Sequence, residues 1–159
     1  MQVALAFRIP IGIDTATERN LSQSDPSRNK RPRPDPRMSR ILLVDDSACF
    51  LHAASRVLRS HGYQVEAVIG PRLALDALGR ERFDLVVSDV NMPELDGFAL
   101  ASAVRALGLR TPTILVSAEP EAGIEDRSVA AGAAAFVPKG AGMRLLCEAV
   151  EGILGRGAG

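Results

Sequence analysis

FDLVVSDVNMPELDG, residues 83–97, is a short apolar run that turns polar at an aspartate and then breaks. The run at 85–87 is apolar and largely β-branched, which is typical of a buried strand. The chain becomes polar at Asp89, and Pro93 and Gly97 then end the regular pattern. The stretch therefore predicts a buried strand that carries a carboxylate to its carboxyl end, where an unpaired charge is costly.

Apolar runs and amphipathic helical segments alternate along the chain from residue 40 onward. Ser47 and Asp96 precede helical patterns as N-caps, and Gly62 is a helix stop. The predicted strands cover residues 41–45, 63–68, 84–89, 111–118 and 134–139. The predicted helices cover residues 47–62, 71–80, 97–108, a short part of 121–133, and 142–154. Continuous apolar strands separated by helices favour a parallel sheet that is covered on both faces.

The order of the strands follows from two further features. Right-handed crossovers leave few topologies, and the alternating polarity of residues 63–68 is typical of an edge strand. We therefore predict an α/β fold of the flavodoxin-like (βα)5 type, with a five-stranded parallel sheet in the order 2-1-3-4-5. In such a sheet the functional crevice lies beyond the carboxyl ends of strands 1 and 3.

Polar side chains stand at the carboxyl ends of four predicted strands. They are Asp45 and Asp46 after the first strand, Asp89 after the third, Ser117 after the fourth and Lys139 after the fifth. The predicted topology brings the three carboxylates together, where they would repel one another. A hard divalent cation relieves that repulsion, and Mg²⁺ suits a site with a few carboxylates and several waters. Lys139 adds a cation on the other side of the pocket.

Four segments of the chain resemble the signature segments of the response-regulator receiver domain. They are ILLVDDS (41–47), LVVSDVNMPELDG (85–97), TILVSA (113–118) and FVPKG (136–140). Each alone is a weak signal, but all four occur in order and at the expected spacings. The resemblance covers residues 40 to about 154, so it implies a receiver fold for that whole part of the chain.

The resemblance also implies a role for each matched residue. Asp89 would take a phosphoryl group from a phosphohistidine of a sensor histidine kinase or a histidine phosphotransfer protein. Asp45, Asp46 and Asp89 would bind Mg²⁺, together with the backbone carbonyl of Asn91.

Three residues would act after the transfer, by the same resemblance. Ser117 would bond to the phosphoryl group and report it, Lys139 would pair with a phosphoryl oxygen, and Phe136 would be the rotating aromatic switch. The family usually has a proline with a cis bond after the lysine, whereas Gly140 follows Lys139 here. A cis bond without proline costs about 2.5–4 kcal/mol, so we expect a different loop geometry at this point.

Composition and charge limit the other functions. Residues 1–39 hold seven Lys or Arg and four Asp or Glu, whereas residues 40–159 hold 12 and 15, a net charge of −3. An acidic domain is a poor nucleic-acid binder, so no direct DNA binding is expected. The chain lacks an apolar run of about 18 residues, so no membrane span is expected. Cys49 and Cys147 lie in apolar helical patterns and are expected to be buried, reduced thiols, which favours a cytoplasmic protein.

The polar, proline-rich composition of residues 1–38 predicts a disordered tail or a mis-called gene start before Met38. Residues 39–156 are then a receiver domain without an output domain. The predicted function is a phosphoacceptor of a two-component system that catalyses only its own phosphorylation and dephosphorylation. A phosphorelay intermediate or phosphate sink is an alternative with the same chemistry. An aspartyl-phosphate phosphohydrolase is an alternative of another class, which often has an aspartate where this chain has Asn91. The sequence names neither the kinase nor the downstream target.

Overall fold

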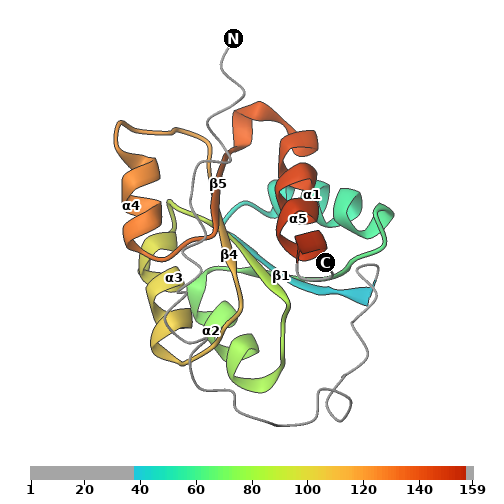
Figure 1. Ribbon diagram of the computed structural model, residues 1–159, viewed down its shortest axis with the longest axis horizontal. Helices are drawn as coiled ribbons and strands as arrows, with labels where there is room; N and C mark the ends of the chain where they lie inside the picture. The colour runs from blue at the N-terminus through green and yellow to red at the C-terminus, as the bar shows by residue number, and fades with distance from the viewer. Residues whose placement is uncertain (1–37, 157–159) are drawn as a thin grey trace, which may run out of the picture.

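A computed structural model describes residues 38–156, apart from the side chain of Arg156 (Figure 1). The strands are β1 (Arg40–Asp45), β2 (Gln64–Ile69), β3 (Leu85–Asp89), β4 (Thr113–Ser117) and β5 (Ala135–Pro138). The helices are α1 (Ala48–Ser60), α2 (Pro71–Arg80), α3 (Gly97–Ala106), α4 (Ile124–Ala130), α5 (Met143–Arg156) and the 3-10 turn η4 (Lys139–Ala141). Every predicted strand and helix is present, and the ends differ by a few residues.

The five strands form one parallel sheet in the order β2-β1-β3-β4-β5, which confirms the predicted fold class. Figure 1 shows α1 and α5 on one side of the sheet and α2, α3 and α4 on the other. The register pairs Val44 with Ser88 and Asp89 with Val116, so β1, β3 and β4 end at nearly the same level. The polar residues at the carboxyl ends of these strands therefore lie side by side along the edge of the sheet that the strand ends form, which is here called the carboxyl edge.

Alternate residues of the central strands pack into the two layers of helices. Ile41 and Leu43 of β1 pack with α1 and α5, whereas Leu42 and Val44 pack with α2 and α3. All residues of β3 and β4 are buried, as a sheet covered on both faces requires. Strand β2 is exposed at alternate positions along part of its length, which confirms its place at the edge.

The predicted helix caps are present. The Ser47 hydroxyl accepts a hydrogen bond from the Phe50 backbone N–H at 3.3 Å, and the Asp96 carboxylate accepts one from the Ala99 N–H at 2.8 Å. Each cap satisfies one backbone donor that has no partner within the helix. Gly62 has a φ of 93°, a conformation that glycine adopts at low cost, and it follows the end of α1 as predicted.

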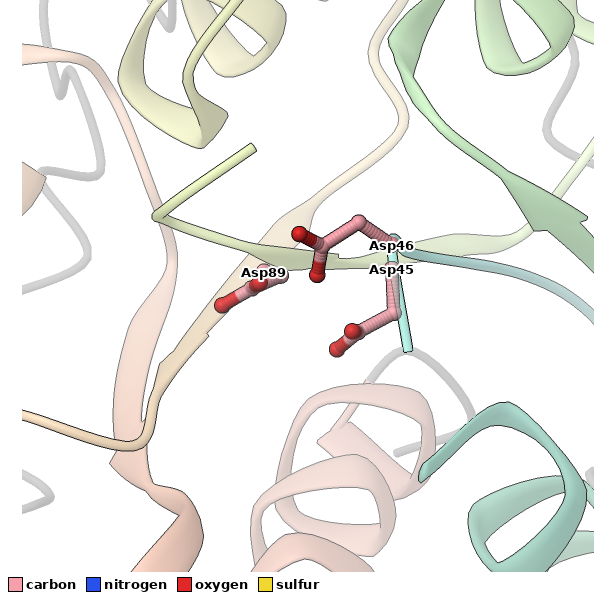
Figure 2. Close-up of side chains that lie close together, drawn as sticks. All are labelled: Asp45, Asp46 and Asp89. Carbon is pink, nitrogen blue, oxygen red and sulfur yellow. The ribbon is translucent and has the colours of Figure 1, made fainter. Parts of the chain in front are cut away.

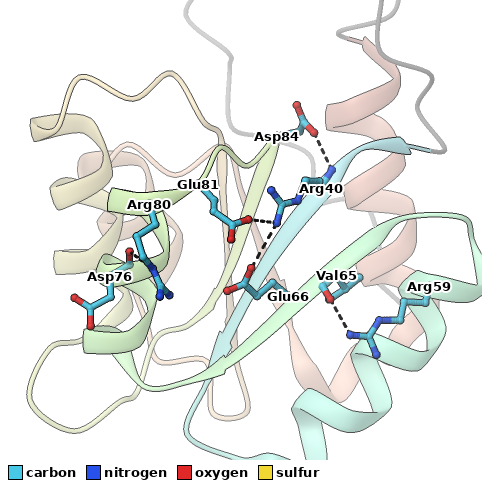
Figure 3. A network of polar contacts seen from close by, with 8 residues as sticks. All are labelled: Arg40, Arg59, Val65, Glu66, Asp76, Arg80, Glu81 and Asp84. Atoms are coloured by element: carbon cyan, nitrogen blue, oxygen red, sulfur yellow. Dashed lines mark hydrogen bonds and ion pairs between the residues drawn. The ribbon is translucent and has the colours of Figure 1, made fainter.

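A polar network joins the strands at the opposite, amino-terminal edge of the sheet (Figure 3). The Arg40 guanidinium pairs with Glu81 and, at 3.6 Å, with Glu66. The Arg40 backbone N–H donates to the Asp84 carboxylate at 2.8 Å. The pairs are about one-third to one-half exposed, so each contributes at most about 1 kcal/mol. Their effect is to join β1, β2 and the start of β3 at the edge away from the polar strand ends.

Two expectations about single residues have different outcomes. Both cysteines are free, and Cys147 is buried as predicted, but Cys49 is exposed, so its predicted burial was wrong. Cys49 lies in the first turn of α1, on the side that faces away from the core.

Among residues 38–156, no helix has the length and apolarity to cross a membrane. Residues 1–37 of the predicted tail lie outside the described residues.

The loop between β3 and α3 contains a strained residue, Glu94, whose φ is 70°. A side chain with a Cβ is disfavoured in this region and glycine is not. We expect Glu94→Gly to raise the free energy of unfolding by about 0.5–1 kcal/mol in urea denaturation. Glu94→Ala is the control, because it removes the same carboxylate but keeps a Cβ. An equal gain in both variants would show that the charge, and not the backbone, is responsible.

An acidic site at the carboxyl edge of the sheet

Three carboxylates meet where β1 and β3 end (Figure 2). Asp45 is the last residue of β1, Asp46 follows it, and Asp89 is the last residue of β3. One oxygen from each carboxylate lies within 4.8 Å of the other two. Asp45 and Asp89 are 0% and 4% exposed, whereas Asp46 is open to solvent. The convergence predicted from the strand order is therefore confirmed.

Lys139 is the ammonium group beside these carboxylates. Its Nζ lies 2.7 Å from Asp45 Oδ2 and 3.5 Å from Asp89 Oδ1. Asp45 Oδ1 accepts a hydrogen bond from the Ser47 N–H at 2.8 Å, and the buried Oδ2 is the oxygen that pairs with the Lys139 ammonium. Three carboxylates and one ammonium leave two negative charges. The net charge of this site and its carboxylate oxygens, as metal ligands, therefore fit one divalent cation of the Mg²⁺ type.

The pKa of Asp89 reflects both its burial and the charges beside it. Burial, followed by the charge of Asp45, raises the pKa of Asp89 from 3.8 to about 6. The Lys139 ammonium and a hydrogen bond from the Asn91 backbone N–H lower the pKa in part, and Asp46 raises it slightly. A bound cation would lower the pKa by favouring the charged form. A further positive charge would therefore stabilise the ionised carboxylate at the end of β3.

The backbone around Asp89 is held in place by close packing. The Ser88 hydroxyl donates a hydrogen bond to the Asp89 carbonyl at 3.0 Å. A Cβ on Gly97 would lie 2.3 Å from that same carbonyl oxygen, so only glycine fits there. The Gly97 N–H also donates to the Val90 carbonyl at 2.9 Å. From its sequence context Gly97 was predicted only to break the regular pattern, and the nearest signal of this packing role is its position directly after the Asp96 cap.

The remaining predicted site residues lie on the neighbouring strands and loops. Ser117 ends β4 and is fully buried, and its hydroxyl accepts a hydrogen bond from the Glu119 N–H at 3.3 Å. Phe136 is 4% exposed and packs in the layer of α3 and α4, in a cluster that includes Leu115. Asn91 is exposed two residues after Asp89. The structure thus places all of the predicted residues near this edge of the sheet, with Phe136 turned into the core.

The loop after β5 begins at Lys139. The Lys139–Gly140 peptide bond is trans, and Lys139–Ala141 forms the short turn η4, which ends before Gly142. A trans bond agrees with the expectation drawn from the absence of proline.

A further contact of Lys139 was not predicted from the sequence. Its Nζ lies 4.4 Å from the ring centroid of Phe50 on α1. Phe50 is half-buried, and it is three residues beyond the Ser47 cap. No periodicity connects residue 50 with residue 139, so only the folded chain brings the two together.

The raised pKa of Asp89 predicts a pH-dependent cost to stability. A carboxyl group that binds its proton more tightly in the folded chain lowers the free energy of unfolding as the pH rises from about 4 to 6. We expect Asp89→Asn to raise the free energy of unfolding by about 1–3 kcal/mol at pH 7.5 in EDTA. Most of that gain should disappear near pH 4, because Asp89 is then protonated in the folded chain.

Urea denaturation at both pH values measures this effect. Asp76→Asn is the matched control, because it removes an exposed carboxylate outside the acidic site. A gain for Asp89→Asn that is the same at both pH values would contradict the assignment.

Comparison with known proteins agrees with this geometry. The family model of the response regulator receiver domain matches residues 41–151. The response regulator FleR of Pseudomonas aeruginosa is 37% identical over 115 residues, which cover 70% of this chain and 24% of that protein. The response regulator MprA of Mycolicibacterium vanbaalenii is 33% identical over 117 residues, which cover 74% of this chain and 51% of that protein.

A solved structure also matches this chain, over nearly the whole length of the solved protein. The chemotaxis protein CheY4 of Vibrio cholerae is 31% identical with a TM-score of 0.69, and the match covers 73% of this chain and 98% of that one. The chain spans about a quarter and about half of the two curated relatives above. The family match, the strand order and the acidic site together show that the chain belongs to the response-regulator receiver family of two-component signalling.

Proposed function

We propose that Asp89 accepts a phosphoryl group and that this modification is the signal the chain carries. The observation that carries the proposal is the carboxylate at the tip of β3, beside Asp45, Asp46 and the Lys139 ammonium. The proposed donor is the phosphohistidine of a sensor histidine kinase or a histidine phosphotransfer protein. The two free cysteines support a reducing compartment, and we propose the cytoplasm.

The transfer is a displacement at phosphorus. An oxygen of the ionised Asp89 carboxylate forms the new P–O bond, the P–N bond to the donor histidine breaks, and the electron pair returns to the imidazole nitrogen. Asp45, Asp46 and Asp89 would hold Mg²⁺, with the carbonyl of Asn91, and the bound cation supplies charge neutralisation for the phosphoryl oxygens. The rigid end of β3 holds the nucleophile in place, so positioning provides much of the catalysis.

The readout is proposed to pass through β4 and β5. Lys139 would move from Asp45 to a phosphoryl oxygen, and the hydroxyl of Ser117 would bond to another. Ser117 now accepts a hydrogen bond from the Glu119 N–H, so its reorientation would alter the loop after β4. Phe136 has no hydroxyl, so its inward and outward positions would differ in packing alone. The surface of β5 and its flanking helices would then bind a downstream protein or pass the phosphoryl group on.

We expect Asp89 to be phosphorylated by acetyl phosphate in the presence of Mg²⁺. Mass spectrometry at low temperature should find one labile adduct, located on the peptide that contains Asp89. The adduct should be absent in Asp89→Asn and strongly reduced in EDTA, because the uncompensated carboxylates repel the incoming phosphate. An adduct of equal yield in EDTA, or one that persists in Asp89→Asn, would rule out this site.

We expect Lys139→Arg to lose more of the switch response than of the phosphorylation yield. A compact ammonium can contact a single phosphoryl oxygen as a point charge, whereas the guanidinium is planar and broader. Backbone NMR shifts of Ser117 and Phe136 on addition of beryllofluoride measure the response. Lys139→Ala is the comparison that also removes the charge. A response in Lys139→Arg equal to that of the unchanged chain would show that only the charge of Lys139 matters.

A further inference from the structure

The ammonium of Lys139 is held by two carboxylates and one aromatic ring. Asp45 Oδ2 lies 2.7 Å away, Asp89 Oδ1 lies 3.5 Å away, and the Phe50 ring centroid lies 4.4 Å away. The Lys139 side chain is only 16% exposed, so its charge has lost much of its hydration. The attraction between a cation and an aromatic face is stronger when water is excluded from it.

The three partners differ in what phosphorylation would do to them. Asp89 would become an acyl phosphate and lose its carboxylate charge, and Asp45 would be engaged by the bound cation. The ring of Phe50 has no oxygen that could bind a metal, so it attracts the ammonium without competing for the cation. Phe50 is therefore the one of these three partners that can keep its contact with Lys139 before and after the transfer.

The backbone next to Lys139 does little to fix the position of the ammonium. Gly140 follows it, and a Cβ at Gly140 would meet no atom within 4 Å among the described residues. The next residues form only the short turn η4. Because no proline follows Lys139 and position 140 has no side chain to pack, the contacts of the Lys139 side chain contribute strongly to the position of the ammonium.

We propose that Phe50 is a positioning residue for Lys139, one that holds the ammonium over the acidic site while its carboxylate partners change. The inference rests on the proposed function of Asp89 and deepens it. In this role Phe50 acts through Lys139 and not on the phosphoryl group itself.

A purely structural role for Phe50 must be separated from this one, because its side chain also packs against the core between α1 and α5. Phe50→Leu keeps an apolar side chain in that core and removes the aromatic face. Phe50→Tyr keeps the aromatic face. A positioning role predicts that Tyr restores what Leu loses, whereas a packing role predicts that Leu is tolerated or that every property of the site declines together.

The first test observes the contact directly and needs no phosphorylation. The chain has only two lysines, Lys30 and Lys139, so lysine labelled with ¹³C gives a simple NMR spectrum, and Lys139→Arg identifies the Lys139 signal. We expect an upfield ring-current shift of the Lys139 Cε protons in the unchanged chain and in Phe50→Tyr, and its loss in Phe50→Leu. An identical Lys139 signal in Phe50→Leu would overturn the inference.

The second test measures beryllofluoride affinity at saturating Mg²⁺, with Mg²⁺ affinity measured separately. We expect Phe50→Leu to weaken beryllofluoride binding roughly threefold to tenfold and Phe50→Tyr to restore it, with Mg²⁺ affinity unchanged. Unchanged beryllofluoride binding in Phe50→Leu, or an equal loss of Mg²⁺ binding, would overturn the positioning role. If the unchanged chain binds no beryllofluoride, the proposed function fails, whereas the ring-current measurement still decides whether Phe50 holds Lys139.

Discussion

The repulsion among Asp45, Asp46 and Asp89 is the constraint on which the rest of the site depends. A parallel sheet whose winding reverses between β1 and β3 places these residues side by side, and one ammonium offsets only part of their charge. Burial of Asp89, followed by the charge of Asp45, raises the pKa of the Asp89 carboxyl to about 6. The folded chain should therefore be less stable at neutral pH than it would be with a neutral residue at position 89, and a bound divalent cation would relieve that cost.

The surrounding structure keeps this unfavourable arrangement in place. Gly97 packs directly against the Asp89 carbonyl, and the register of β3 with β4 pairs Asp89 with Val116, the residue before Ser117. Strands β3 and β4 are buried along their whole length, so Asp89 cannot move away from Asp45 without loss of packing. The stability of the core is thus what allows a charge cluster to persist at its edge.

The sequence was sufficient for the fold and for the acidic cluster, because both follow from rules about periodicity and topology. Apolar runs identified the strands, the caps at Ser47 and Asp96 identified helix starts, and the strand order brought Asp45 beside Asp89. Three details were outside the reach of such rules. The exposure of Cys49 depends on how α1 is rotated about its axis. The need for glycine at position 97 depends on a close approach of two backbone segments. The contact of Phe50 with Lys139 depends on side chains from elements that are distant in the sequence.

The pKa of Asp89 tests the central claim most directly, because it reports both the burial of the carboxylate proposed to react and the charges around it. Carboxyl ¹³C NMR titration with labelled aspartate, assigned with Asp89→Asn, should show Asp89 titrating at about 6 in EDTA. With saturating Mg²⁺ the same group should titrate at a clearly lower pH, because the bound cation favours the ionised form. An Asp89 that titrates near 3.8 in EDTA, or whose titration Mg²⁺ leaves unchanged, would contradict the account.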